Sequence, residues 1–134
     1  MRLNHVTLIV SNLERSIRFY RVLGLQPIVL APPRYARFTM PSGDGTLSIE
    51  VTGETALPSR VQIYFEFASA DALDARAAEL LAAGLQFTHQ PTDMDYLWRE
   101  ARLRDPDGHD LRLYHAGSNR LDPPWKIAPG DVPG

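Results

Sequence analysis

The side chains best suited to chemistry in this chain alternate with apolar residues in two short segments, 3–10 and 61–67. The polar residues at alternate positions of these segments are His5, Thr7, Gln62, Tyr64 and Glu66. Successive side chains of a strand point to opposite faces, so each polar set shares one face and the apolar set takes the other. An imidazole, hydroxyls, an amide and a carboxylate on one enclosed face could hold a metal ion or a polar ligand.

Later segments show the same alternation. In 47–52, Glu50 shares a face with Ser48, and in 111–115 the polar residue between two leucines is Arg112. If these two segments are aligned, a shift of one residue would place every apolar residue of one opposite a polar residue of the other. The alternation, or parity, therefore matches Glu50 with Arg112. Trp98, Glu100 and Arg102 share the polar face of the segment 97–104. The polar faces together predict a cleft.

The elements that position these faces occur twice. Ser11 to Glu14 has the spacing of a capping box, and the amphipathic helix that follows ends at Gly24. A second helix is expected over 71–83, before Gly84. Each helix follows one strand and precedes three, with prolines between the elements. The order is therefore β-α-β-β-β twice, as an α+β domain over residues 1–118, with modules at about 1–57 and 58–118. A proline-rich, extended tail is expected over 119–134.

Composition excludes several classes of function. The 134 residues contain 14 Lys and Arg against 16 Asp and Glu, which gives a net charge of −2 and argues against a nucleic-acid surface. Cysteine is absent, so thiolate nucleophiles and cysteine-ligated metals are excluded. No apolar run approaches the length of a membrane span. We expect a soluble, cytoplasmic protein with no membrane or nucleic-acid partner.

Four motifs in this order resemble the glyoxalase, bleomycin-resistance and ring-cleaving dioxygenase superfamily, also called vicinal oxygen chelate proteins. They are Leu3-Asn-His-Val-Thr-Leu-Ile-Val10, Asn12-Leu-Glu-Arg-Ser-Ile-Arg-Phe-Tyr20, Val22-Leu-Gly-Leu25 and Asp105-Pro-Asp-Gly108. The resemblance implies that the two modules form a curved, half-open barrel with the helices outside. It leaves open whether the modules close within one chain or across a homodimer.

The resemblance also implies a divalent metal, whose ligands come from the first and fourth strands of each module. Carried over, these positions are His5, Glu50, Gln62 and Arg112. His5 and Glu50 suit a metal, and Gln62 is a weaker, neutral donor. Arg112 cannot coordinate a cation, and a unit charge about 4 Å away costs about 4 kcal/mol at an effective dielectric near 20, roughly doubled for a divalent ion. Glu100 could neutralise Arg112 or replace it as a ligand.

Two functions follow as hypotheses. In the first, the protein resembles bleomycin-resistance proteins and binds a small organic molecule through Thr7, Gln62, Tyr64, Trp98 and Arg112, with an incomplete metal site. In the second, it resembles metal-dependent lyases, isomerases or dioxygenases of the superfamily. A nickel, zinc, iron or manganese ion on His5 and Glu50 would then act as a Lewis acid, with Glu50 and Glu100 as catalytic carboxylates. The cofactor is thus one divalent metal or none. His109, after the Asp-Pro-Asp-Gly turn, is expected to be exposed.

Overall fold

The computed structural model describes residues 1–131 and contains two α-helices and eight strands. In chain order these are β1 (His5–Ile9), α1 (Leu13–Leu23), β2 (Gln26–Ala31), β3 (Tyr35–Thr39), β4 (Thr46–Glu50), β5 (Gln62–Glu66), α2 (Ala70–Ala82), β6 (Phe87–Asp93), β7 (Arg99–Arg104) and β8 (Asp110–His115). Two short 3-10 turns, Gly117–Asn119 and Pro129–Asp131, follow.

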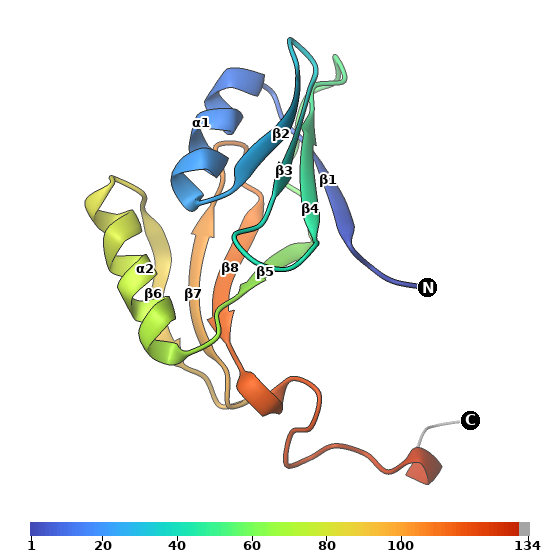
Figure 1. The fold of residues 1–134 in the computed structure, drawn as a ribbon, viewed down its shortest axis with the longest axis vertical. Coiled ribbons are helices and arrows are strands. Elements are labelled where there is room, and N and C mark those ends of the chain that lie inside the picture. The colour runs from blue at the N-terminus through green and yellow to red at the C-terminus, as the bar shows by residue number, and fades with distance from the viewer. Residues whose placement is uncertain (132–134) are drawn as a thin grey trace.

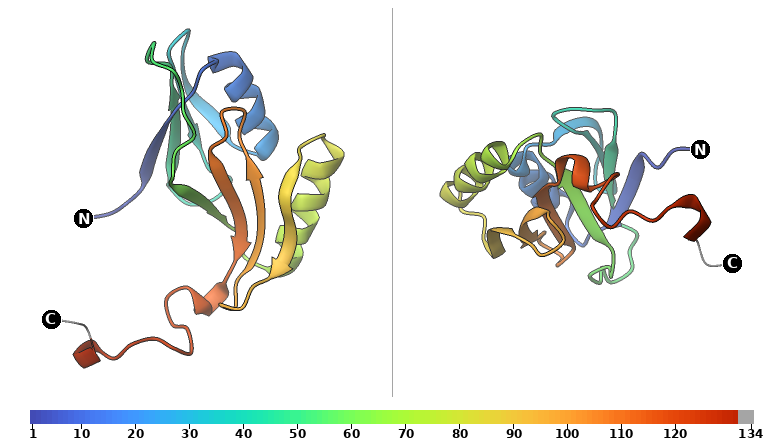
Figure 2. Two further views of the ribbon diagram at one scale, coloured as in Figure 1. Left: turned by 180° about the vertical axis from the view of Figure 1, so that it is seen from behind. Right: turned by 90° about the horizontal axis from the view of Figure 1, so that it is seen from below.

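The strands form two four-stranded sheets of identical topology. The first has the order β1-β4-β3-β2 and the second β5-β8-β7-β6, each with one parallel pair, β1 with β4 and β5 with β8. Neither sheet closes on itself, and α1 and α2 lie on the same side of the molecule, as Figures 1 and 2 show. The repeated β-α-β-β-β order, the α+β class and the curved, half-open arrangement are confirmed.

The helix ends differ in one detail from the sequence prediction. Asn12, rather than Ser11, is the N-cap of α1, and its side chain accepts a hydrogen bond from the backbone N–H of Arg15 at 2.9 Å. The hydroxyl of Ser11 instead donates to Asp107 at 2.6 Å. Asparagine caps a helix as well as serine does, so the spacing alone did not distinguish the two residues. Gly24 ends α1 as predicted, with a φ of 121° that favours glycine.

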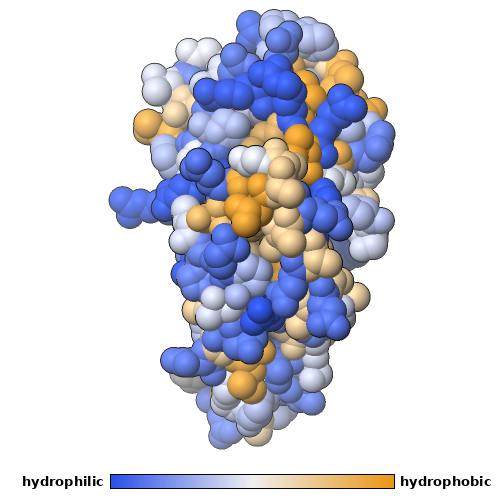
Figure 3. Space-filling view, turned by 90° about the vertical axis from the view of Figure 1, so that its left-hand side faces the viewer, coloured by the Kyte–Doolittle hydropathy of each residue, from blue (hydrophilic) through white to orange (hydrophobic). Residues whose placement is uncertain are grey.

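The apolar side of each strand packs against the helices in one hydrophobic core. Leu8 and Val10, on the apolar face of the first segment, are buried, and Ile63, Phe65 and Phe67 of the second pack against the core. Its fully buried large members include Tyr20, Phe38, Leu47, Ile49, Leu73, Leu80, Leu103, Leu111 and Leu113. The opposite faces of the sheets are left to polar side chains. Figure 3 shows the helix-bearing side, where hydrophilic groups surround apolar atoms near the middle.

Buried polar contacts join the two modules. The hydroxyl of Tyr20 on α1 donates to Asp105, in the β7–β8 turn, at 2.7 Å. Burial, and then the charge of Asp105, raises the pKa of Tyr20 above its ordinary value, so this hydroxyl remains a donor. His109 contacts the backbone carbonyl of Ile9 through Nε2 at 2.8 Å, and its Nδ1 accepts from the backbone N–H of Ser59 at 3.2 Å. His109 therefore carries its proton on Nε2.

The expectation that His109 is exposed is wrong, since it is only 2% accessible. Its turn lies against the end of β1 rather than in solvent, a long-range contact that a local turn motif does not reveal.

The C-terminal segment leads away from the sheets (Figure 1). The side chain of Trp98 donates to the carbonyl of Asn119 at 3.4 Å, and Arg120 pairs with Glu66 at 3.6 Å. Beyond them Trp125 is 56% exposed. The last part of the predicted tail, residues 132–134, lies outside the described residues. Among residues 1–131, neither helix is long and apolar enough to cross a membrane.

Substitution of Tyr20 by Phe tests the junction between the modules. It leaves a buried carboxylate oxygen of Asp105 without its donor, so we expect the free energy of unfolding to fall by about 1–3 kcal/mol. Urea denaturation followed by circular dichroism measures the loss. Tyr64→Phe is the matched control, because its hydroxyl lies on a partly exposed side chain with long contacts, and it should cost about 0.5 kcal/mol or less. Equal losses in the two variants would contradict the structural role of the Tyr20 contact.

Candidate functional site

The polar face of the first sheet consists of three cross-strand rows. They are His5–Thr46–Thr39, Thr7–Ser48–Arg37 and Ile9–Glu50–Tyr35, each read from β1 through β4 to β3. His5 and Thr7 are exposed, Tyr35, Arg37 and Glu50 are half-buried, and Ser48 is fully buried. Apart from Ile9, every side chain in these rows is polar.

Hydroxyl groups surround the imidazole of His5. Its Nδ1 lies 2.6 Å from Thr46 Oγ1, and its Nε2 lies 3.2 Å from Thr7 Oγ1 and 3.3 Å from Ser48 Oγ. Ser48 Oγ in turn lies 2.5 Å from the hydroxyl of Tyr35. Both ring nitrogens of His5 are therefore already in hydrogen bonds.

One order of donors satisfies the whole network. The Nε–H of Arg37 donates to the hydroxyl oxygen of Tyr35 at 3.0 Å, so the phenol proton is free to donate to Ser48. Ser48 then donates to Nε2 of His5, and Nδ1–H of His5 donates to Thr46. Ser48 can also turn to donate to the phenolate form of Tyr35, and this hydrogen bond, helped by the hydrogen bond and charge of Arg37, lowers the pKa of Tyr35.

The polar face of the second sheet contains a fully buried carboxylate. Glu100 on β7 has no accessible surface, and it accepts a hydrogen bond from the hydroxyl of Tyr96 at 2.7 Å. Arg102 donates to it from Nε and Nη2 at 3.2 and 3.1 Å, and Nη1 of Arg112 lies at 3.5 Å. Arg112 also pairs with Asp110 at 3.2 Å. An isolated buried charge is strongly unfavourable, and these partners compensate it.

A cluster of aromatic rings lies on the same face. Trp98 stacks on Tyr114 with ring centroids 4.8 Å apart, and Tyr64 meets both rings edge-on at 5.7 and 5.3 Å. Tyr96 meets Trp98 at 5.9 Å. The guanidinium of Arg112 lies 5.6 Å from the centre of the Tyr64 ring. The predicted ligand-binding residues Tyr64, Trp98 and Arg112 are thus brought into one cluster.

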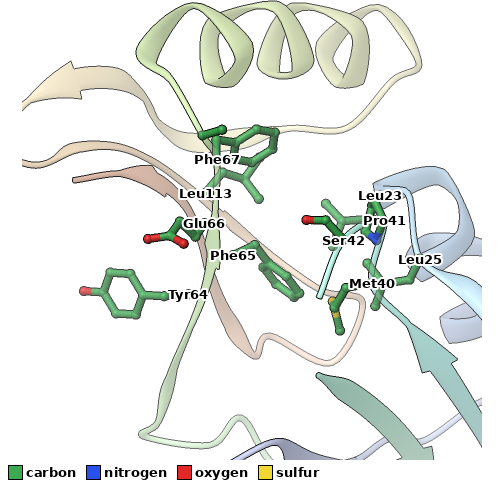
Figure 4. Close-up of a pocket in the computed structure, with 11 residues that line it drawn as sticks. Leu23, Leu25, Met40, Pro41, Ser42, Tyr64, Phe65, Glu66, Phe67 and Leu113 are labelled. Atoms are coloured by element: carbon green, nitrogen blue, oxygen red, sulfur yellow. The ribbon is translucent and has the colours of Figure 1, made fainter. Parts of the chain in front are cut away.

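Gln62 adjoins that cluster, since the hydroxyl of Tyr64 donates to its Oε1 at 3.4 Å. It lines, with His5, a largely apolar groove of about 510 Å³ along β1 and β5. A second cavity of about 300 Å³ lies between β5 and the end of α1. Figure 4 shows Phe65 pointing into this cavity toward Met40, while Tyr64 and Glu66 point to the other side of β5. Gln62 therefore lines the same groove as His5, whereas Glu50 and Arg112 line neither this groove nor the second cavity.

The strand pairing corrects one inference about register. Arg112 pairs with Tyr64, two residues after the start of β5, whereas Glu50 pairs with Ile9, four residues after the start of β1. The residue of the first module that corresponds to Arg112 is therefore Ser48, opposite Thr7. The faces on which Glu50 and Arg112 lie were predicted correctly, but the match between these two residues is wrong by two positions. Alternation repeats every second residue, so it cannot detect a shift of two.

The residues present do not fit a divalent metal. In the part of the chain that the structure describes, no three His, Cys, Asp or Glu side chains come together as a metal site. The corresponding positions on the first and fourth strands hold His5, Ser48, Gln62 and Arg112. Only the imidazole is a strong ligand in that set, and one member is a cation.

Sequence reasoning did not single out Tyr35, Arg37 or Tyr96. Tyr35 and Arg37 lie at alternate positions of β3 and so carry the same period-two signal that identified His5 and Thr7. Tyr96 lies between β6 and β7, outside any strand, and reaches Glu100 through the fold of that connection. Burial, and then its hydrogen bond with Glu100, raises the pKa of Tyr96, so its hydroxyl stays a donor.

Replacement of Glu100 by Gln tests whether the buried carboxylate organises this face. The substitution keeps the shape but removes the charge that compensates Arg102 and Arg112, so we expect the free energy of unfolding to fall by about 2 kcal/mol. Glu50→Gln is the matched control and should change stability by about 0.5 kcal/mol or less. Urea denaturation at neutral pH gives both values, and a neutral effect of Glu100→Gln would argue against this role.

Comparison with known proteins agrees with the geometry. The chain matches the model of the Glyoxalase/Bleomycin resistance protein/Dioxygenase superfamily over residues 2–113. A glyoxalase/bleomycin resistance protein/dioxygenase from Nocardioides has a similar structure, with a TM-score of 0.75 and 22% identity over 96% of this chain and 90% of that one. A lactoylglutathione lyase from Agrobacterium tumefaciens has a TM-score of 0.74 and 15% identity, over 90% of this chain and 96% of that one.

A glyoxalase-related enzyme from Fulvimarina pelagi gives a TM-score of 0.72 and 21% identity over 96% of this chain and 94% of that one. No protein with a curated description matches the chain. At these identities the structural likeness shows the fold, while the family match covers most of the sequence. The chain belongs to the glyoxalase/bleomycin resistance protein/dioxygenase superfamily.

Proposed function

We propose that this protein binds a small organic molecule on the polar faces of its two sheets, without the metal of the family. One observation carries the proposal. Arg112, at the position where the family resemblance implies a metal ligand, is fixed by contacts with Asp110 and the buried Glu100. The positive charge of Arg112 disfavours a metal ion at this position, and the nearby residues supply hydrogen-bonding and aromatic groups instead.

The second face suits a flat ligand with polar substituents. Tyr64 is 37% exposed and Trp98 is half-buried, so both present ring surface that a planar molecule could cover. The exposed side chains Thr7 and Gln62 are the hydrogen-bonding residues that we assign to the ligand from the neighbouring strands. Glu100 is fully occupied by Tyr96 and two arginines, and we assign it the role of positioning Arg112.

The alternative is a metal-dependent lyase, isomerase or dioxygenase. It would need His5 and Glu50 to gain a third ligand, and Glu100 would have to leave its arginine partners. No observation on the described residues favours that rearrangement, so the alternative serves as an outcome of the metal experiment below.

A homodimer is part of the proposal. The strands β1 and β5 each lie at the edge of their sheet, with one side unpaired, and the groove along them has Leu3 and Val61 exposed at 97% and 58%. Edge strands and apolar side chains of this kind are commonly covered by another chain. Sedimentation velocity should show a species of twice the chain mass, and a monomer at high concentration would exclude it.

Metal uptake distinguishes the two functions. Equilibrium dialysis against nickel, zinc, manganese or ferrous ions, followed by elemental analysis, should give far less than one ion per chain. The physical reason is that only one strong ligand occupies the four corresponding positions. One ion per chain, lost in both His5→Ala and Glu50→Ala, would overturn the metal-free proposal and support the alternative.

Ligand binding can be followed at Trp98. The chain has two tryptophans, and Trp125→Phe leaves Trp98 as the single reporter on the proposed face. Aromatic compounds that bind there should change its fluorescence in a saturable way. The matched variant Trp98→Phe, in which only the tail tryptophan reports, should give no saturable change. A library that produces no response at Trp98 would contradict small-molecule binding at this face.

A further inference from the structure

Arg37 is a half-buried cation on the first polar face that forms no ion pair with the described residues. Its Nε donates to the hydroxyl of Tyr35 at 3.0 Å, and its guanidinium lies 5.5 Å from the centre of that ring. Within residues 1–131 it forms no ion pair, and no protein acceptor takes its terminal N–H groups. A guanidinium is always charged, and partial burial favours an anionic partner for it.

The internal repeat shows what an arginine at this position does. Arg102 pairs with Arg112 across β7 and β8, and Arg37 pairs with Ser48 across β3 and β4. Because Ser48 corresponds to Arg112, Arg37 corresponds to Arg102. In the second module Arg102 binds a carboxylate, Glu100, through two nitrogens.

The carboxylate has no equivalent in the first module. Glu100 lies opposite Tyr114, and its counterpart, opposite Glu50, is Tyr35. A phenol can accept one hydrogen bond from the arginine, but it carries no compensating charge at neutral pH. The first module therefore retains the cation of this arrangement and lacks the anion.

The neighbours of Arg37 on the adjacent strands do not compensate its charge. On β4 its partner is Ser48, whose hydroxyl is already hydrogen-bonded to Tyr35 and His5, and on the β2 side its neighbour is the apolar Val29. The charged or titratable groups on this face are His5, at the far end of the hydroxyl network, and Glu50, opposite Tyr35. Glu50 would repel an anion, so its charge must be outweighed by direct contacts with the guanidinium.

We propose that Arg37 binds the oxyanion of the small molecule, a carboxylate or phosphate group, through its terminal N–H groups, so that the ligand supplies the negative charge that Glu100 supplies to Arg102 in the second module. This inference rests on the proposed function and specifies its ligand class. The bound anion would accept from the terminal N–H groups of Arg37, because Nε already donates to Tyr35, whereas Glu100 accepts from Nε and Nη2 of Arg102. The planar guanidinium matches both anions through paired hydrogen bonds.

Matched pairs of charged and neutral compounds test the proposal. Benzoate, phenyl phosphate and the neutral benzamide are titrated into the full chain, while the Nε–H signals of its arginines are followed by NMR. We expect benzoate or phenyl phosphate to shift the Arg37 signal in a saturable way, and the stronger of the two identifies the anion. Benzamide should bind at least about tenfold more weakly.

Variants separate a direct contact from a general effect of charge. Arg37→Gln should weaken anion binding about tenfold or more. Arg37→Lys keeps the charge but loses the planar guanidinium, so its affinity for the anion should lie between those of Arg37→Gln and the unchanged chain. Arg34→Gln is the matched control, because it removes the same charge from an exposed site nearby and should have little effect. Binding to each variant is read from the shifts of the remaining arginine and aromatic signals. Glu50→Gln should strengthen anion binding.

Each outcome bears on the proposal. Equal binding of benzamide and benzoate, unaffected by Arg37→Gln, would overturn the oxyanion site and leave small-molecule binding standing. Equal losses in Arg34→Gln and Arg37→Gln would show a diffuse charge effect and also overturn it. No binding of any of the three compounds to a folded chain would reject the site, whereas the wider fluorescence screen at Trp98 decides the proposed function separately.

Discussion

The burial of one carboxylate determines much of the chemistry of the second module. Glu100 has no accessible surface, and a buried charge is tolerated only when hydrogen bonds and opposite charges replace the water it has lost. Tyr96, Arg102 and Arg112 supply them. As a consequence Arg112 is held on the polar face, at the place where the family resemblance implies a metal ligand.

The two modules use one scaffold for different chemistry. Their strand orders and pairings are the same, so corresponding positions can be compared directly. Where the second module has an ion-pair cluster around Glu100, the first has Tyr35 and a chain of hydroxyls that leads to His5. A neutral network of this kind needs no buried counter-charge, and for this reason it can leave Arg37 for an external partner.

The sequence was sufficient for the elements and for the faces, but not for every pairing. Alternation identified which side chains lie on the polar faces of the sheets, and His5, Glu100 and Arg112 are among them. The contact between Arg112 and Glu100 was also anticipated. The match of Glu50 with Arg112 failed because loops of different length permit shifts of two residues that preserve parity. The burial of His109 depends on its contact with Ile9, a hundred residues away, which local patterns do not encode.

The junction between the modules explains why the polar faces can differ so much. Tyr20 with Asp105, and His109 with the carbonyl of Ile9, lie at the end of β1 and along α1, away from the rows that contain His5 and Arg37. The backbone of Ile9 fixes the end of β1 whichever side chains the polar face carries. Substitutions on the polar faces can therefore change their side-chain chemistry with little cost to the contacts that hold the modules together, except at Glu100, where the face and its stability depend on the same buried charge.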